Sequence, residues 1–321
     1  MCPASNISDS MTLRRPGRGE GRHGRVAFTL VELLVTLVIV AILAALTLGG
    51  LAGVRQGAKA DKTRNTIRKI DAVISPMYDS YRTRRVTATT AGAASRNYDQ
   101  LLRDKRTLLI YEMPDQWSDV PIAITGVPAQ FQTATVRAYA IARPSNPNPL
   151  FSGAECLYMI VERSGYDPDA LEFFRSNEIG DVDQDGKPEF LDGWGRPIAF
   201  LRWAPGFVSD PSSVTLNPRR YSPIQVADSV NAHDPLDPTG RDPAAYALVP
   251  LIYSAGPDGA LGSPADDVTG YGLQLGPTGG WLTNAGTLLP NLCTGPAATV
   301  GTPLSGNESL DNITNHDLLK K

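Results

Sequence analysis

The feature that most restricts the fold of this sequence is an apolar run without a charged residue, which covers residues 33–54. As an α-helix this run would extend about 33 Å, which is enough to cross the hydrocarbon core of a bilayer. The basic residues before it are all arginines, namely Arg14, Arg15, Arg18, Arg22 and Arg25. By the positive-inside rule we expect a single-pass membrane protein with a cytoplasmic N-terminus and its body on the other side.

Glu32 stands at the start of this run, and a carboxylate in a membrane helix needs an explanation. Placing an ionised side chain in a bilayer costs about 2.5–3.5 kcal/mol at the centre and less near the interface, so such a residue usually has a partner. Cleavage after Ala27 would create one, because it leaves a free amine on Phe28, on the same helical face as Glu32. Between subunits, an amine and a carboxylate in a low dielectric would attract strongly and set the axial register of a helical stack.

The residues around this point, AFTLVELLVTLVIVAIL, resemble the N-terminal cleavage and methylation signature of type IV pilins and type II secretion pseudopilins. The resemblance implies that a prepilin peptidase cuts between Ala27 and Phe28 and methylates the new amine, and that Glu32 pairs with the amine of a neighbouring subunit. An ordinary secretory signal or signal anchor explains the arginines and the apolar run, but it leaves Glu32 unexplained. The residues that match the signature are Ala27 (where the family usually has glycine), Phe28, Thr29, Leu30, Val31 and Glu32.

An amphipathic pattern follows the apolar run. Apolar residues recur at three- and four-residue spacing from Ile67 to Tyr81, which predicts that one helix runs from Phe28 to about Tyr81 and that Pro76 bends or frays its last turns. The resemblance implies an α+β, pilin-like fold in which this helix packs on a small antiparallel sheet with long loops. The expected parts are a leader (1–27), a membrane and assembly helix (28–54), its amphipathic continuation (55–85) and an extracytoplasmic globular domain (86–321).

The globular part is expected to be rich in loops, because the chain has 30 glycines and 26 prolines. Alternation and composition predict strands over residues 133–143, 197–203 and 247–255. Short helices are expected over residues 152–162, where Ser152 and Glu155 have the spacing of a capping box, and over residues 167–174. Loops or insertions are expected over residues 86–98, 204–246 and 271–310.

The first candidate metal site is the acidic stretch DVDQDGKPEFLD. Asp181, Asp183 and Asp185 occupy positions 1, 3 and 5 of a twelve-residue calcium-loop pattern, and Asp192 occupies position 12. Pro188 at position 8 and the lack of a clear flanking helix pair argue against an EF-hand, so a calcium site of another geometry is expected. The alternative is a solvated turn in which aspartate side chains accept hydrogen bonds from the backbone.

The second candidate metal site is SAGPDGALGSPADDV, where Asp258, Asp266 and Asp267 flank a glycine-rich turn. Together with LDGWGRPIAFL, this stretch resembles the C-terminal region of the major pseudopilin of type II secretion systems. The resemblance implies that an Asp-x-Trp-Gly-x-Pro segment leads into a strand and that the later loop binds calcium, with Asp311 as an equal candidate for its closing acid. The matching residues are Asp192, Trp194, Gly195, Pro197, Ser254, Gly256, Asp258, Gly259 and Asp267.

The cysteines, the histidines and the net charge of the sequence exclude several classes of function. Cys156 and Cys293 form either one disulfide in an oxidising compartment or two unpaired buried thiols. The three histidines are scattered, and no HExxH, P-loop, Gly-x-Ser-x-Gly or Cys-x-x-Cys motif occurs, so we expect no enzyme. A net charge of −3, with a basic leader and an acidic body, argues against nucleic acid as a partner.

We therefore expect a structural subunit of a type IV pilus-like fibre or a type II secretion pseudopilus. It would sit in the bacterial inner membrane through residues 33–54, with its body in the periplasm or in an extracytoplasmic fibre. Its partners would be the prepilin peptidase and other pilin or pseudopilin subunits, of the same or another kind, and calcium would be its one cofactor. The alternative is a membrane-tethered extracytoplasmic calcium-binding module that never polymerises.

Overall fold

The structure is a computed structural model of the whole chain, and it describes residues 29–86, 98–147, 151–203, 234–240, 250–259 and 311–318. Within these ranges, the side chains of residues 47–52, 99 and 317 are not described. The chain divides into two compact units, Met1–Ala52 and Gly53–Lys321. The predicted leader, including Ala27, lies outside the described residues, and so does Phe28.

The longest element is α1 (Leu30–Ser80), a helix of 51 residues that begins in the first unit and ends in the second. In the first unit, all the side chains of α1 that are described are exposed, among them Leu33, Leu37 and Leu43. Within the part of the chain that is described, no helix qualifies as long and apolar enough for a membrane span. The predicted span over residues 33–54 includes side chains that lie outside this part.

In the second unit, α1 buries the predicted amphipathic stripe. Ile67, Ile70 and Ile74 are fully buried in the hydrophobic core, and Met77 and Tyr81 are only 4% and 1% exposed. The stripe that the spacing predicted is therefore confirmed. The helix also continues through Pro76 to Ser80 without fraying there, since buried side chains on both sides of the proline hold its last turn in the core.

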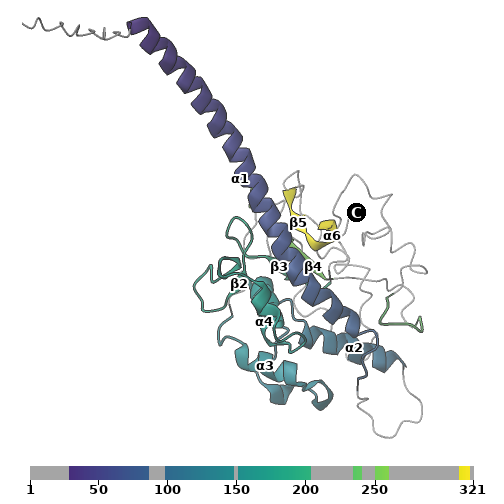
Figure 1. Cartoon of the computed structure of the whole chain (residues 1–321). Helices are drawn as coiled ribbons and strands as arrows, with labels where there is room; N and C mark the ends of the chain where they lie inside the picture. The colour runs from purple at the N-terminus through teal and green to yellow at the C-terminus, as the bar shows by residue number, and fades with distance from the viewer. Residues whose placement is uncertain are drawn as a thin grey trace, which may run out of the picture. The chain divides into compact units, whose positions relative to one another are not determined.

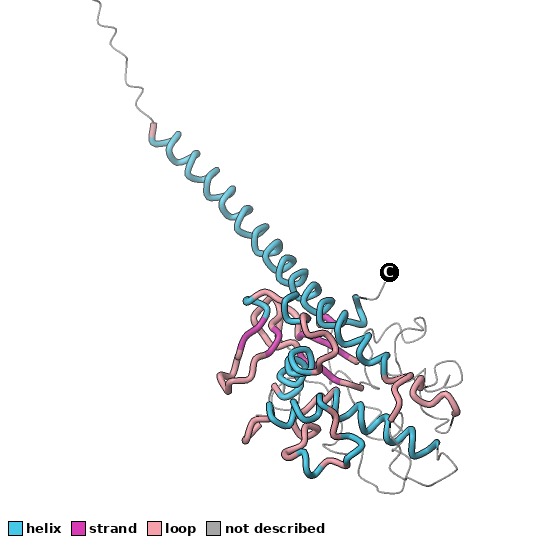
Figure 2. Tube along the Cα trace, turned by 60° about the horizontal axis from the view of Figure 1, so that its bottom comes forward, coloured by secondary structure: helices cyan, strands magenta, loops and turns pink. Residues whose placement is uncertain are grey.

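The rest of the second unit is built from short helices and small antiparallel sheets, so the described part of the chain is α+β (Figures 1 and 2). The α-helices are α2 (Tyr98–Glu112), α3 (Ala134–Ala142), α4 (Ser152–Arg163) and α6 (Asn315–Leu318). Single 3-10 turns cover Ile124–Gly126, Ala129–Phe131, Ala170–Phe173 and Ser176–Glu178. The strands are β1 (Ile179–Gly180), β2 (Glu189–Phe190), β3 (Ala199–Leu201), β4 (Leu251–Ser254) and β5 (Ile313–Thr314).

The strands form two sheets. β1 and β2 make a hairpin in which Gly180 pairs with Glu189. β3, β4 and β5 make a three-stranded antiparallel sheet in that order, with Phe200 opposite Ile252. α4 packs against β2 and β3, as Figure 1 shows, and it thereby joins the hairpin to the larger sheet.

The second half of α1 is fastened to these sheets by hydrogen bonds as well as by apolar contacts. The amide of Gly193, just before β3, donates to Thr63 Oγ1 (2.8 Å). The side-chain amide of Asn315, at the start of α6, donates to Asp71 Oδ1 (2.9 Å). Because these partners are distant in sequence, the helix holds together segments that would otherwise be separate loops.

Residues 133–143 form a helix, so the predicted strand is wrong. Thr133 caps α3, and its Oγ1 accepts a hydrogen bond from the amide of Val136 (3.3 Å). Val136 and Tyr139 are both fully buried, and their three-residue spacing is that of one helical face. The pattern of valine, tyrosine and alanine fits both the two-residue repeat of a strand and the 3.6-residue repeat of a helix. Packing against α4 selects the helix.

Other predicted elements agree more closely with the structure. The strands expected over residues 197–203 and 247–255 contain β3 and β4, and the helix expected over residues 152–162 is α4. The expected helix over residues 167–174 is a 3-10 turn, and α2 was not predicted. The predicted loops lie mostly outside the described residues.

Gly193 gives the first testable prediction, because a Cβ added there would overlap the backbone carbonyl of Lys59 in α1. Gly193→Ala should lower the free energy of unfolding by about 1–3 kcal/mol, since neither backbone can yield easily. Gly126→Ala is the matched control, because nothing lies within 4 Å of its added Cβ. Equilibrium urea unfolding of the full chain measures both, and equal effects would contradict the close approach.

Candidate functional site

The start of α1 is closed by a reciprocal capping box. The amide and the hydroxyl of Thr29 both donate to Glu32 Oε2 (2.9 Å each), and the amide of Glu32 donates to Thr29 Oγ1 (3.2 Å). This pattern satisfies backbone groups that the first helical turn leaves unpaired. Sequence reasoning overlooked it, although Thr-x-x-Glu before an apolar run is its signature.

The capping box leaves part of the Glu32 carboxylate available. Its hydrogen bonds all go to Oε2, and Oε1 accepts none from the described residues. Leu30 and Val31, which follow Thr29 in the predicted signature, are exposed. Cleavage after Ala27, methylation of Phe28 and pairing of Glu32 with another subunit therefore stay predictions.

The acidic stretch forms the loop between β1 and β2. Asp181 Oδ2 accepts from the amide of Gly186 (2.9 Å), Asp183 Oδ1 accepts from that of Asp185 (3.3 Å), and Asp185 Oδ1 accepts from that of Lys187 (2.8 Å). Carboxylate oxygens of the three aspartates also lie within 4.8 Å of one another. The backbone bonds are those of the solvated turn that stood as the alternative to a metal site.

Asp192 does not join this group. It is fully buried, and its Oδ1 accepts from the amides of Trp194 (2.8 Å) and Arg196 (2.9 Å). Its Oδ2 accepts from the hydroxyl of Ser254 at the end of β4 (2.8 Å). Asp192 thus ties the turn before β3 to the neighbouring strand, which is a structural use of both carboxylate oxygens.

The second acidic loop is described only in part, because Asp266 and Asp267 lie outside the described residues. Asp258 is exposed, and the pairing of β5 with β4 brings Asp311 beside it. Burial, together with the neighbouring Asp258 carboxylate, raises the pKa of Asp311. Arg196 also reaches this turn and donates to the carbonyl of Gly256 (2.8 Å), so the acids here have a cation close by.

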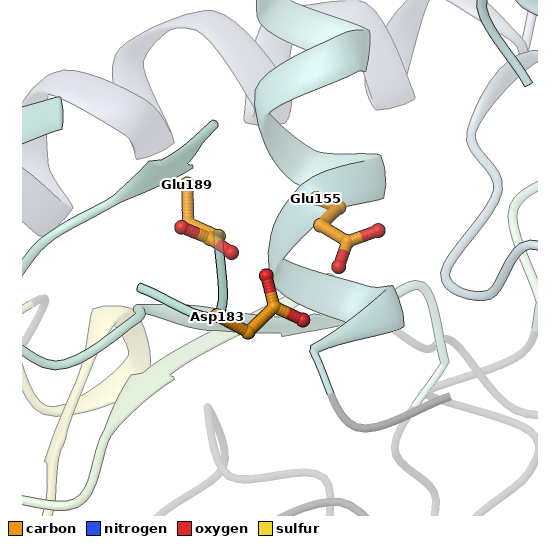
Figure 3. A group of neighbouring side chains, drawn as sticks. All are labelled: Glu155, Asp183 and Glu189. Carbon is orange, nitrogen blue, oxygen red and sulfur yellow. The ribbon is translucent and has the colours of Figure 1, made fainter. Parts of the chain in front are cut away.

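A further group of acids was not predicted, and two of its three members are buried. Glu155 from α4, Asp183 from the hairpin loop and Glu189 from β2 point toward one another (Figure 3), and carboxylate oxygens of all three lie within 4.8 Å. Glu155 is 1% exposed and Glu189 is 0% exposed. The Oε1 atom of each glutamate has no hydrogen-bond partner among the described residues.

The other oxygen of each glutamate is held by a donor from a different segment. Glu155 Oε2 accepts a hydrogen bond from the indole N–H of Trp117, and Glu189 Oε2 accepts from the amide of Val182 (3.1 Å).

Ser152 was predicted to form a capping box with Glu155. Instead its Oγ accepts from the amide of Trp117 (2.7 Å), and Phe151 is the N-cap residue of α4.

Burial dominates the electrostatics of this group. It raises the pKa of Glu155 to about 7 and the pKa of Glu189 to about 8, and the nearby carboxylates add to both shifts. The hydrogen bonds from Trp117 and Val182 act in the opposite direction, but they do not offset the burial. Lys187 also lowers the pKa of Glu155, but its ammonium donates to the backbone carbonyl of Ala142 (2.8 Å).

Cys156 follows Glu155 in α4 and is a fully buried thiol with no disulfide partner among the described residues, and burial raises its pKa well above the usual value. Cys293 lies outside the described residues, so the disulfide between them stays a prediction.

Comparison of the chain with protein-family models, with curated proteins and with solved structures found no match in any of the three. The residues and their geometry therefore carry any functional inference.

The buried glutamates predict a pH dependence of stability. Because their pKa values in the folded chain lie above the ordinary value of 4.5, the unfolded chain loses these protons at lower pH. Their contribution is complete below about pH 4.5 and is lost as the pH rises through 7–8. In metal-free buffer the free energy of unfolding should fall by roughly 1–3 kcal/mol between pH 5 and pH 8.

Thermal unfolding of the full chain at several pH values measures this fall. Glu189→Gln should flatten the profile, because an amide does not ionise. Glu162→Gln, an exposed glutamate on the same helix, should keep the wild-type profile. A Glu189→Gln profile as steep as that of the wild type would contradict the assignment.

Proposed function

We propose that this protein is a pilin-like structural subunit of a type IV pilus-like fibre or a type II secretion pseudopilus. It is inserted in the bacterial inner membrane through residues 33–54, cut after Ala27, methylated at Phe28, and assembled with other subunits through α1. The body then lies in the periplasm or in an extracytoplasmic fibre. The observation that carries this proposal is the change of character along α1, from exposed and apolar to amphipathic and buried.

Support comes first from the apolar side chains of the first unit. Leu34, Leu37 and Val40 are 56%, 62% and 61% exposed, and many of their neighbours are similarly exposed. No charged residue occurs between Glu32 and Arg55. A continuous apolar surface of this kind is unfavourable in water, and it fits lipid or the same surface of other subunits.

Support comes next from the second half of α1. Here the helix is part of the hydrophobic core, and side-chain hydrogen bonds join it to residues beside β3 and in α6. One continuous helix therefore belongs both to the apolar segment and to the folded body. A subunit that assembles through its N-terminal helix needs such a link, because the link makes the body follow the helix into the fibre.

Glu32 supplies the polar part of the proposed assembly. Its Oε2 caps its own helix, while Oε1 accepts no hydrogen bond from the described residues. The carboxylate can therefore serve the helix and also accept the N-terminal amine of a neighbouring subunit. In a low-dielectric surrounding, this pair disfavours any register in which the carboxylate has no partner.

The processing step gives a direct prediction. Mass spectrometry of the mature protein should find an N-terminal peptide that begins with N-methylated Phe28. The signature around Ala27 places the cut there, whereas an ordinary signal peptidase would cut near Gly50 and Ala52. A mature chain that begins at Gly53, or one that retains its leader, would contradict the proposal.

Two substitutions separate the charge of Glu32 from its capping role. Glu32→Gln keeps the capping box, because glutamine serves at this position as well as glutamate, but it removes the charge. Thr29→Ala removes the capping hydroxyl and keeps the carboxylate. We expect Glu32→Gln to reduce assembled fibre by at least about tenfold, since a charge pair worth about 1.4 kcal/mol or more is lost, and Thr29→Ala to assemble almost normally.

Sedimentation of sheared fibres and cross-linking between subunits measure assembly, and membrane fractionation verifies that both variants are inserted. If only Thr29→Ala fails to assemble, Glu32 acts as a cap and not as a charge. If neither substitution changes a protein that never sediments as a fibre, the chain is the tethered, non-polymerising module. Either result would overturn the proposed role of Glu32.

A further inference from the structure

We propose that Glu155, Asp183 and Glu189 bind a calcium ion inside the body of the protein, between α4 and the β1–β2 hairpin. The site differs from the predicted one, which used the exposed aspartates of the loop and Asp192. It shares only Asp183 with that prediction. It also differs from the turn that contains Asp258, at the end of β4.

The first argument is convergence from three separate elements. Glu155 belongs to a helix, Glu189 to a strand and Asp183 to a loop, yet their carboxylates face one another (Figure 3). Like charges repel, so an arrangement that gathers three carboxylates without an ion is unfavourable. A cation at their centre reverses the sign of this interaction.

The second argument concerns the hydrogen bonding of the two glutamates and does not depend on the distances between the carboxylates. Buried polar atoms in folded proteins nearly always have a partner, and an exception needs an explanation. Glu155 Oε1 and Glu189 Oε1 are both buried, and neither has a partner among the described residues. Two vacant carboxylate oxygens inside one acidic cluster are what a bound cation would satisfy.

The third argument compares the ion pairing of Glu155 and Glu189 with that of other buried charged groups. Neither Glu155 nor Glu189 makes an ion pair with a residue that the structure describes, whereas several other buried charged groups do. Ionising a buried carboxyl group without a counter-charge is strongly destabilising, and a bound cation is a counter-charge that would allow these two to ionise. The paired examples are Arg202 with Asp119 (3.0 Å), Arg106 with Asp234 (2.6 Å) and Lys69 with Glu178 (2.7 Å).

The spacing of the oxygens fits calcium. Ligand oxygens lie about 2.3–2.6 Å from Ca²⁺, so two of them on opposite sides of the ion are at most about 5 Å apart. One carboxylate oxygen from each of Glu155, Asp183 and Glu189 lies within 4.8 Å of the other two, which is inside that limit.

The chemistry of the ligands also favours calcium. Among the described residues the site offers carboxylate oxygens, which suit hard cations, and no histidine or cysteine ligand of the kind that zinc and copper prefer. Magnesium usually keeps several of its waters, which a buried site accommodates poorly, whereas calcium accepts irregular sets of carboxylates. We therefore expect calcium to bind at least about tenfold more tightly than magnesium.

The exposed part of the loop has a supporting role in this site. Gln184 and Gly186 have positive φ angles of 62° and 87°, so the chain turns sharply after Asp183. Asp181 and Asp185 accept hydrogen bonds from the amides within this turn and hold it in shape. The turn thereby presents Asp183 toward α4, which makes the aspartates of the loop positioning residues.

The test uses the full chain in detergent, freed of metal ions, and titrated with calcium chloride or magnesium chloride. At about one hundred times the dissociation constant, calcium should raise Tm by roughly 5–10 °C. The fluorescence of tryptophan should change as well, because the indole N–H of Trp117 donates to Glu155. No change in Tm or fluorescence with calcium would overturn the proposal.

Variants place the response at the buried site. Glu155→Gln and Glu189→Gln should each lose most of the calcium-induced rise in Tm. Glu162→Gln, the exposed glutamate of the same helix, should respond like the wild type. Asp183→Asn changes the third ligand, which is in the loop outside the buried core, and it should also lose most of the calcium-induced rise in Tm. This variant keeps the test decisive if a glutamine variant does not fold.

Asp258→Asn distinguishes this site from the other acidic loop, and it should keep the full response. A calcium response that depends on Asp258 and survives Glu189→Gln would overturn the proposal. The result does not depend on fibre assembly, because the three ligands lie in the second unit and the assembly experiment changes residues in the first. A failure of one proposal therefore leaves the other standing.

Discussion

The structure depends on the burial of one face of α1 in the second unit. Ile67, Ile70 and Ile74 lie at the centre of the core, and each is fully buried. The sheets are short, with strands of two to four residues, so they cannot form a stable layer by themselves. A long helix supplies the apolar surface that such strands need, and its hydrogen bonds to Gly193 and Asn315 hold two segments that are far apart in the sequence against it.

The same packing sets the environment of the acids. α4 lies against β2 and β3, which carries Glu155 to the hairpin and removes it from water. The turn before β3 is held by Asp192, whose carboxylate is occupied by backbone amides and by Ser254. Two acids of the same stretch therefore have different roles. Asp192 stabilises the sheet, and Glu189 belongs to the buried cluster. The difference arises from the position of each residue in the fold, because both side chains carry the same chemical group.

Much of the fold could be predicted from local patterns. α1, its amphipathic half, α4, β3 and β4 were all expected, because hydrophobic periodicity and chain breaks are local signals. The strand assigned to residues 133–143 was wrong, since that short segment fits both periods and only its contacts with α4 select a helix. The capping box of Thr29 and Glu32 also has a local signal, because Thr-x-x-Glu before an apolar run is the spacing that these hydrogen bonds require.

The candidate cation site was less accessible to sequence reasoning. The calcium-loop pattern identified Asp183 and placed the closing ligand at Asp192, whereas the structure brings Glu189 and Glu155 to Asp183. Sequence by itself determined the change of character along α1 and the presence of an acidic turn, because both depend on neighbours in the chain. Only the tertiary structure decided which acids meet in the interior, because that depends on the packing of α4 on the hairpin, and no local pattern encodes a contact between separate elements.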